Sequence, residues 1–213
     1  MENTIQFIEK HKIIVIVRGV EKEKLLPLAE AMYQGGIRLI ECTYDASGKI
    51  ADEEIAANIR MLAEHFEGKM AVGAGTVLTE KQVELTKKAG GTFIISPDTN
   101  PELIAFTKKC GLVSIPGALT PTEVASAHRA GADFVKLFPI NLHGSKYVKD
   151  LRAPLSHIRM LAVGGITVHN LKEYLEAGAV GVGVGSGIVD KKMIAENRFD
   201  DIVNFARQYT EQL

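Results

Sequence analysis

The chain has 213 residues, a formal net charge of −1 at pH 7, and acidic and basic side chains interspersed along its length. This balance argues against the basic patches of nucleic-acid-binding proteins, and no apolar run is long enough to span a bilayer. The only two cysteines, Cys42 and Cys110, are far apart and indicate neither a disulfide framework nor a zinc ribbon. We therefore expect a cytoplasmic protein with a single domain, residues 1–213, and no nucleic-acid or membrane partner.

Eight short apolar segments alternate along the chain with stretches of helical periodicity. The segments lack a strict alternation of apolar and polar residues, which is typical of strands buried on both faces. The predicted strands are 13–17, 37–42, 70–72, 92–95, 113–115, 134–137, 158–163 and 180–184. The clearer predicted helices are 22–34, 52–66, 80–88, 101–109, 121–129 and 168–176, with flanking helices at 3–9 and 198–212.

The boundaries of these elements carry signals of their own. Several predicted helices end in glycine directly before a strand, and glycine tolerates the left-handed conformation that ends a helix. These glycines are Gly35-Gly36, Gly90-Gly91, Gly111, Gly131 and Gly178. The predicted N-cap residues are Thr79, Asn100, Thr120 and Thr167. Eight strand–helix repeats predict an α/β protein with a parallel sheet closed into a (β/α)8 TIM barrel, in preference to an open doubly wound sheet.

One lysine stands inside a predicted strand. Lys136 lies in the apolar run 134–138, and an unpaired ammonium is costly to remove from water. Burial should lower its pKa below the usual value of about 10.4, and the neutral amine is the form that attacks a carbonyl. Because the strand ends at the predicted barrel mouth, where such active sites lie, we interpret Lys136 as a catalytic nucleophile. The alternative is a structural lysine that is paired with an acid or solvated at an edge.

Two more charged residues lie at predicted strand ends. Glu41, at the end of the second strand, could shuttle protons to and from a substrate bound at Lys136. A structural ion pair of Glu41 with Lys136 or Arg18 is the alternative, and both readings can hold together. Arg18, at the end of the first strand, could bind a carboxylate or phosphate through two parallel hydrogen bonds, or it could pair with Glu41.

Glycine-rich segments follow the seventh and eighth predicted strands. Gly164-Gly165 and Gly185-Ser186 could present backbone N–H groups to a phosphate, which barrels often bind at this place. The first segment is followed by Thr167 and a predicted helix, whose N-terminus would favour an anion. Tight turns without a ligand are the alternative.

The remaining polar residues suggest no further chemistry. None of the six histidines has the spacing of metal ligands, and we expect neither a metal nor a cofactor. The lysine pairs, including Lys191-Lys192, are interpreted as solvated ends of helices or loops.

Taken in order, these segments resemble a known family over essentially the whole chain. It is the class I aldolases of the 2-keto-3-deoxy-6-phosphogluconate (KDPG) type, which often also act on 4-hydroxy-2-oxoglutarate (KHG). The resemblance is carried by IVIVR (14–18), IECT (40–43), GAGTV (73–77), ISP (95–97), IPG (115–117), TPTE (120–123), KLFP (136–139) and GGI (164–166).

The resemblance implies roles for several residues and a reaction. It implies that Lys136 forms the Schiff base, that Glu41 shuttles protons, and that Thr76 binds the pyruvate carboxylate beside Pro97 in the wall of the site. The residues matching the family's phosphate loops are Gly164, Gly165, Gly185 and Ser186. The implied reaction cleaves a small-molecule 2-keto acid to pyruvate and an aldehyde, D-glyceraldehyde 3-phosphate or glyoxylate, without a metal. The family is typically homotrimeric.

The chain departs from the family pattern at two positions. Many members carry Arg four residues after the catalytic Glu, where it binds the substrate carboxylate, and here that residue is Asp45. Two carboxylates ~5 Å apart would repel by about 3 kcal/mol at an effective dielectric constant of 20. Asp45 could therefore point away, Arg18 or Lys49 could supply the charge, or the preferred substrate could differ. The second position is Val163, where many members carry Thr before the Gly-Gly pair. A Val at this position is compatible with the phosphogalactonate-type relatives.

Three alternative functions stay open on the sequence alone. One is cleavage of 2-keto-3-deoxy-6-phosphogalactonate. Another is a different phosphosugar barrel enzyme, such as an isomerase or a decarboxylase, although Pro139 occupies the place of an Asp that orotidine-type decarboxylases need. The third is a non-catalytic sugar-phosphate-binding protein, which would bind phosphate without reacting at Lys136.

Overall fold

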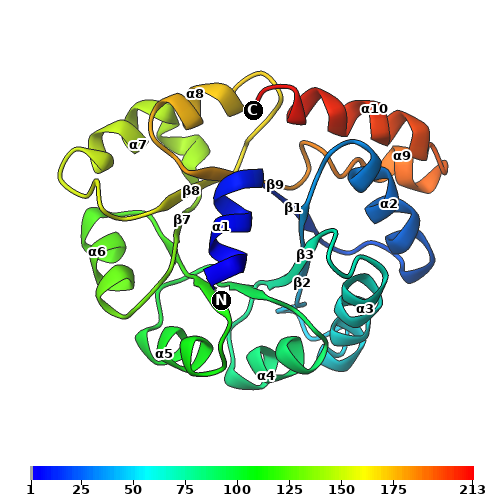
Figure 1. The fold of residues 1–213 in the computed structure, drawn as a ribbon, viewed down its shortest axis with the longest axis horizontal. Helices are drawn as coiled ribbons and strands as arrows, with labels where there is room; N and C mark the ends of the chain where they lie inside the picture. The colour runs from blue at the N-terminus through cyan, green and yellow to red at the C-terminus, as the bar shows by residue number, and fades with distance from the viewer. Residues whose placement is uncertain (1) are drawn as a thin grey trace.

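Parallel strands form one sheet that closes on itself, and helices surround it (Figure 1). The computed structural model describes residues 2–213. The strands are β1 (Ile13–Val17), β2 (Leu39–Thr43), β3 (Ala71–Gly75), β4 (Phe93–Ile95), β5 (Val113–Ile115), β6 (Gly117–Ala118), β7 (Val135–Leu137), β8 (Met160–Val163) and β9 (Gly181–Val184). Their order in the sheet is β5-β4-β3-β2-β1-β9-β8-β7-β6. The predicted (β/α)8 barrel is confirmed.

The predicted fifth strand, 113–115, is β5, and the ninth strand is the short β6 directly after it, which the sequence does not predict. Pro116 separates β5 from β6 and has no N–H to donate to a neighbouring strand. On one side of Pro116, β5 pairs with β4, and on the other, β6 pairs with β7. The carbonyl of Pro116 accepts from Lys136 N at 2.8 Å, so β5 and β6 together join the two edges and close the barrel.

The helices lie outside the barrel and alternate with the strands. They are α1 (Glu2–His11), α2 (Lys22–Gln34), α3 (Asp52–His65), α4 (Glu80–Lys88), α5 (Pro101–Lys109), α6 (Pro121–Arg129), α7 (Gly144–Arg152), α8 (Leu171–Glu176), α9 (Lys191–Ala195) and α10 (Phe199–Thr210), with a 3-10 turn, η1, at Ile140–Leu142. Of these elements, α7, α9 and η1 are not predicted by the sequence. In the part of the chain that the structure describes, no helix is both long and apolar enough to cross a membrane.

Most predicted helix boundaries are confirmed by their hydrogen bonds. The side chain of Asn100 accepts from the N–H groups of Glu102 and Leu103, and Thr120 forms a capping box with Glu123. The prediction for Thr167 was wrong, because α8 begins only at Leu171. A turn precedes α8, in which the Thr167 N–H donates to the Asn170 side chain.

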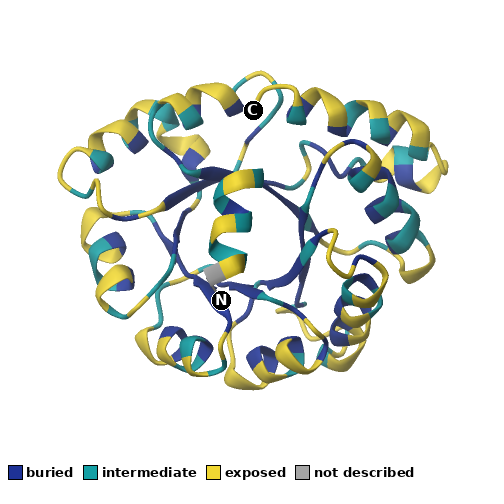
Figure 2. Cartoon of the chain, viewed as in Figure 1, coloured by how far each residue is buried: buried dark blue, intermediate teal, exposed yellow. Residues whose placement is uncertain are grey.

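The strand residues alternate between two apolar layers. One layer fills the space between strands and helices, and Figure 2 shows the buried faces of the helices turned toward the strands. The other fills the barrel itself and includes Ile14, Leu39, Phe93 and Phe134. Ile8 of α1 packs into this inner layer, and Figure 1 shows α1 lying across the barrel opening. Because α1 leads directly into β1, it covers the N-terminal end of the barrel and leaves the C-terminal end as the open mouth.

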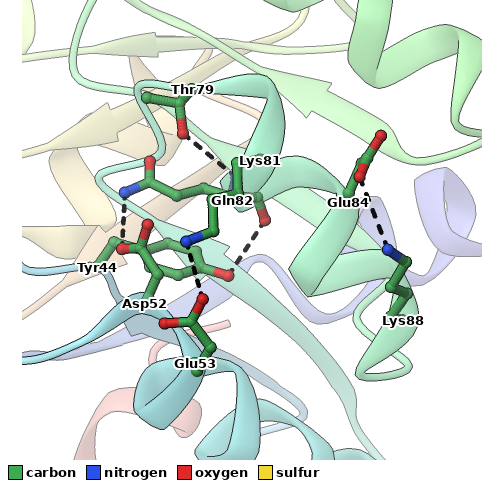
Figure 3. Close-up of polar contacts among 8 residues, drawn as sticks. All are labelled: Tyr44, Asp52, Glu53, Thr79, Lys81, Gln82, Glu84 and Lys88. Atoms are coloured by element: carbon green, nitrogen blue, oxygen red, sulfur yellow. Dashed lines mark hydrogen bonds and ion pairs between the residues drawn. The ribbon is translucent and has the colours of Figure 1, made fainter.

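Polar contacts hold the C-terminal end of β2 against α4 (Figure 3). Tyr44 directly follows β2, is fully buried, and donates from its hydroxyl to the Gln82 carbonyl at 3.1 Å. The Gln82 amide donates to Asp52 of α3 at 3.0 Å. Lys81 of α4 also pairs with Glu53 of α3 at 2.8 Å. These contacts fix the end of the strand that carries Glu41.

Candidate active site

Two charged side chains enter the barrel interior because of strand alternation. Glu41 lies two residues after Leu39 in β2, so both point to the same face of the sheet. Lys136 in β7 lies two residues after Phe134 in the same way. Leu39 and Phe134 belong to the inner apolar layer. Glu41 and Lys136 therefore occupy the next layer toward the open mouth of the barrel.

Lys136 is held in apolar surroundings. Its side chain is only 9% exposed. Burial lowers its pKa, while the charge of Glu41 raises it and the charge of Arg18 lowers it further. Its Nζ lies 4.8 Å from the centre of the Phe138 ring, on the mouth side of the same strand. Removal of the ammonium from water thus favours the neutral amine, which is the nucleophilic form.

Glu41 is more deeply buried than Lys136. It is 1% exposed, and its Oε2 has no hydrogen-bond partner among the described residues. Burial raises its pKa to about 7, against the opposing effects of the charges of Lys136 and Arg18. A carboxyl group with a pKa near neutrality can both release and take up a proton at physiological pH.

Gly75 makes room for the carboxyl group of Glu41. A Cβ atom at residue 75 would lie 2.3 Å from Glu41 Oε1, far inside contact distance. Gly75 ends β3, which pairs with β2 in register, Thr43 opposite Gly75. The sequence analysis did not single out this residue for that purpose. A glycine inside a strand is a known sign of close approach, so the signal was present.

Glu41 and Lys136 share a small space inside the barrel. The space measures about 10 Å³, about the size of one water molecule. Its other lining residues are Ile14, Ile16, Ile95, Ile115, Leu161, Val163 and Gly183. No ion pair joins Lys136 to Glu41 among residues 2–213, so their charges interact across this space without direct contact. The apolar lining is the physical cause of both pKa shifts.

Arg18 and Thr76 meet at the mouth of the barrel. The Arg18 guanidinium donates to Thr76 Oγ1 at 2.8 Å, and the described residues contain no ion pair between Arg18 and Glu41. Thr76 has a φ of 56°, a strained conformation for a β-branched residue. Such strain is typical of residues held in place by a functional site. The two side chains together present a cation and a hydroxyl next to the buried pair.

Asp45 is engaged with its own loop. Its carboxylate accepts from the N–H groups of Ser47, Lys49 and Ile50 and from the Ser47 hydroxyl, at 2.8 to 3.0 Å. These hydrogen bonds lower its pKa to about 2. Of the possibilities raised by the sequence, the structure favours an Asp45 that serves the loop 45–50 rather than the substrate.

Two larger cavities open beside Arg18. The first, about 320 Å³, lies between the ends of β1 and β2 and the helices α2 and α3, and its lining includes Asp45 and Lys49. The second measures about 460 Å³ and is lined by Ile16, Arg18, Gly185, Ser186, Val189, Asp190 and Lys191. Ile16 lines both the second cavity and the inner space with Lys136. The second cavity and the inner space therefore share one wall residue.

The other predicted residues lie around the same mouth. Pro97 is half-buried, and its carbonyl passes so close to Gly117 that a Cβ there would lie 2.2 Å from the oxygen. Gly164 and Gly165 pack against Asn141 of η1 and do not line the cavity with Gly185. In the described part of the chain, no three His, Cys, Asp or Glu side chains come together as a metal site would require.

The chain is similar to known aldolases over nearly its whole length. A family model described as KDPG and KHG aldolase matches residues 4–205. The 2-dehydro-3-deoxy-phosphogluconate aldolase of Haemophilus influenzae is 31% identical over 209 residues, 96% of this chain and 95% of that protein. The 2-dehydro-3-deoxy-6-phosphogalactonate aldolase of Escherichia coli is 30% identical over 208 residues, 97% of this chain and 98% of that protein.

A solved structure shares both the fold and this level of identity. It is the KDPG aldolase from Legionella pneumophila with pyruvate captured as a covalent carbinolamine intermediate. The TM-score is 0.85 at 28% identity, and the match covers 95% of this chain and 96% of that one.

Proposed function

Because this chain belongs to the KDPG and KHG aldolase family, we propose that it cleaves KDPG or a related 4-hydroxy-2-keto acid through a Schiff base on Lys136. The products would be pyruvate and an aldehyde, D-glyceraldehyde 3-phosphate or glyoxylate. The observation that carries this proposal is a buried amine that shares an apolar space with a buried carboxyl group at the barrel mouth. Such a pair of perturbed groups suits a carbonyl addition that needs a neutral nucleophile and a proton carrier.

The proposed reaction begins at the amine. Neutral Lys136 adds to the C2 carbonyl of the substrate, and the nitrogen proton passes to oxygen to give a carbinolamine. Loss of water then gives an iminium. Glu41, as a carboxylate, takes the proton of the C4 hydroxyl while the C3–C4 bond breaks, and the electron pair of that bond enters the iminium. The aldehyde leaves and an enamine remains on the lysine.

The second half of the reaction returns the proton. Glu41 protonates C3 of the enamine, which regenerates an iminium, now of pyruvate. Addition of water to this iminium releases pyruvate and restores the free amine. A carboxyl group with its pKa raised to about 7 can fill both roles in one cycle.

Arg18 and Thr76 are the proposed partners of the substrate carboxylate. Their hydrogen bond at 2.8 Å places a guanidinium and a hydroxyl together at the mouth. In many relatives an Arg at the position of Asp45 supplies the positive charge for this carboxylate. Here the Asp45 carboxylate is hydrogen-bonded to N–H groups of its own loop, and the Arg18 guanidinium is proposed to supply the charge instead. Pro97 is proposed as part of the wall that holds the pyruvate portion.

The proposed phosphate contacts are backbone N–H groups at the ends of β8 and β9. Gly185 and Ser186 line the 460 Å³ cavity together with Arg18, which supports this role. Gly164 and Gly165 are proposed for the same function from the family pattern. Since α8 begins only at Leu171, any contact there would come from the loop rather than from a helix end.

Cleavage of 2-keto-3-deoxy-6-phosphogalactonate is a second candidate. Val163 supports it, because it lies beside Lys136 and Glu41 where many KDPG-type members carry Thr. The 30% identity to the Escherichia coli phosphogalactonate aldolase is of the same size as that to the phosphogluconate enzymes. The family also supports three further expectations: a cytoplasmic enzyme, a homotrimer, and a reaction without metal or other cofactor.

Pyruvate release from separate substrates tests the proposal. Purified protein would be incubated with KDPG, its galactonate epimer and KHG, and pyruvate would be measured with lactate dehydrogenase, with and without EDTA. We expect cleavage of at least one substrate, unaffected by EDTA, and none by Lys136→Met. Cleavage that Lys136→Met retains would contradict the Schiff-base mechanism, and strong inhibition by EDTA would favour a metal-dependent enzyme.

A further inference from the structure

The cavity at the ends of β1 and β9 contains a cation that the family motifs do not include. Lys191 is the first residue of α9 and lines the 460 Å³ cavity with Arg18, Gly185 and Ser186. Its neighbour in the chain, Lys192, does not line this cavity. From the sequence both lysines are interpreted as solvated ends of a helix or loop, and the structure separates the two residues.

The charges around this cavity favour an anion. Arg18 and Lys191 contribute two positive charges, and Asp190 contributes one negative charge. Asp190 Oδ1 is already used as the N-cap of α9, where it accepts from Met193 N at 2.8 Å. No ion pair joins Lys191 to a carboxylate within residues 2–213. An amine without a protein counterion in the described part of the chain, in a cavity also lined by Gly185 and Ser186, is suited to a doubly charged phosphate.

The position of the cavity fits the far end of the substrate. Ile16 separates this cavity from the space that holds Lys136 and Glu41. A substrate bound covalently at C2 would extend from the inner space through the mouth, and its last carbon would reach the outer cavity. The cation at residue 191 would then meet the substituent at C6.

We propose that Lys191 is a specificity-determining residue that selects substrates with a phosphorylated tail. This inference rests on the proposed aldolase function and adds to it one residue that distinguishes phosphorylated from unphosphorylated 2-keto acids. Lys191 binds the phosphate as a point charge and the loop at Gly185 and Ser186 offers N–H groups, while Arg18, on the opposite side of the cavity, stays with Thr76 and the substrate carboxylate. Lys191 has no part in the chemistry at C2 to C4.

The test compares Lys191→Met with Lys192→Met. Both variants remove an exposed lysine from α9, and only residue 191 lines the cavity. For each protein, kcat/KM is measured on KDPG and on its dephosphorylated form, 2-keto-3-deoxygluconate. We expect the ratio of the two values to fall about tenfold in Lys191→Met, the size of one charge-assisted contact. Lys192→Met should keep the wild-type ratio, and added salt should reduce the difference.

Inhibition by inorganic phosphate gives a second readout. Phosphate should compete with KDPG in the wild type and in Lys192→Met, and its inhibition constant should rise in Lys191→Met. An equal change of the ratio in both variants, or no change in either, would overturn the role of Lys191. If the wild type cleaves neither substrate nor any other 2-keto acid, the proposed function fails instead, so the two failures are distinguishable.

Discussion

The two ends of the barrel interior use the same strand alternation for opposite purposes. Toward the N-terminal end, Leu39 and Phe134 pack with Ile8 into a closed apolar layer. Two residues farther along the same strands, Glu41 and Lys136 occupy the corresponding positions near the mouth. The first layer gains stability from burial of apolar surface, and the second bears the cost of buried polar groups.

This contrast explains how the barrel tolerates the free-energy cost of burying Glu41 and Lys136. The apolar layer beneath fixes the strands, so that Glu41 and Lys136 are positioned by backbone pairing rather than by a direct ion pair. Gly75 is part of the same design, because a larger residue would displace the carboxyl group. Substitutions in the lower layer should therefore change stability with little effect on activity, and substitutions in the upper layer should change activity, with or without an effect on stability.

The largest effect is expected from Lys136→Met. Met approximates the volume of the side chain but removes the nucleophile, so kcat should fall by roughly 10³-fold or more. Stability should be unchanged or higher, because the variant no longer buries an amine. Pyruvate release and thermal unfolding measured on the same sample would check both parts. A variant that loses activity because it unfolds would contradict the division between the two layers.

Glu41→Gln should slow turnover by roughly 10²- to 10⁴-fold while the affinity for pyruvate is largely kept. Its stability should also depend on pH in a defined direction. The folded-state pKa of Glu41, about 7, lies above its ordinary value of 4.5, so the stability that this group gives the wild type is present below pH 4.5 and lost as the pH rises to 7. Gln does not titrate.

The free energy of unfolding of Glu41→Gln, minus that of the wild type, should therefore rise from pH 5 to pH 8, by on the order of 3 kcal/mol. Chemical denaturation at the two pH values would measure the difference. A stability difference between the proteins that is the same at both pH values would show that Glu41 titrates normally in the folded protein.

Phe134→Ala sharpens the comparison from the other side. Truncation of a fully buried aromatic ring in the apolar layer should lower the free energy of unfolding by about 3–5 kcal/mol. At a temperature where the variant is folded, kcat per folded molecule should stay within about threefold of the wild type, because the substrate does not reach this layer. Denaturant unfolding and active-site titration would separate the two quantities.

The smallest effect is expected from Gly75→Ala, which pushes a methyl group against the Glu41 carboxyl group. We expect a loss of about 1–3 kcal/mol in stability from overpacking, together with reduced turnover. A second substitution, Glu41→Ala, should relieve the clash, so that the stability effects of the two changes are not additive. Additive effects would mean that Gly75 and Glu41 do not contact each other.

The sequence was a good guide where local chemistry decides the structure. The glycine at each helix–strand junction and the caps at Asn100 and Thr120 marked boundaries that the structure confirms. Local signals failed where a competing hydrogen bond exists: the Asn170 side chain takes the Thr167 N–H and delays α8. They also missed β6, because this two-residue strand exists only through its pairing with β7.

The site was only partly predictable, for a related reason. Glu41 and Lys136 stood out as charged residues in apolar strands, and alternation brings them into one layer. The roles of Asp45 and Lys191 depend on loops whose shape follows from several hydrogen bonds together. Asp45 accepts from three backbone N–H groups of its own loop, and Lys191 lines the outer cavity whereas Lys192 does not.

Reductive trapping with pyruvate tests the central claim most directly. The protein would be mixed with pyruvate and borohydride, and the product analysed by intact mass and by peptide mapping. We predict one reduced pyruvate adduct per chain, located on Lys136, formed more slowly by Glu41→Gln and absent from Lys136→Met. Failure to find an adduct, or an adduct spread over surface lysines in both the wild type and Lys136→Met, would contradict the assignment of Lys136 as the nucleophile.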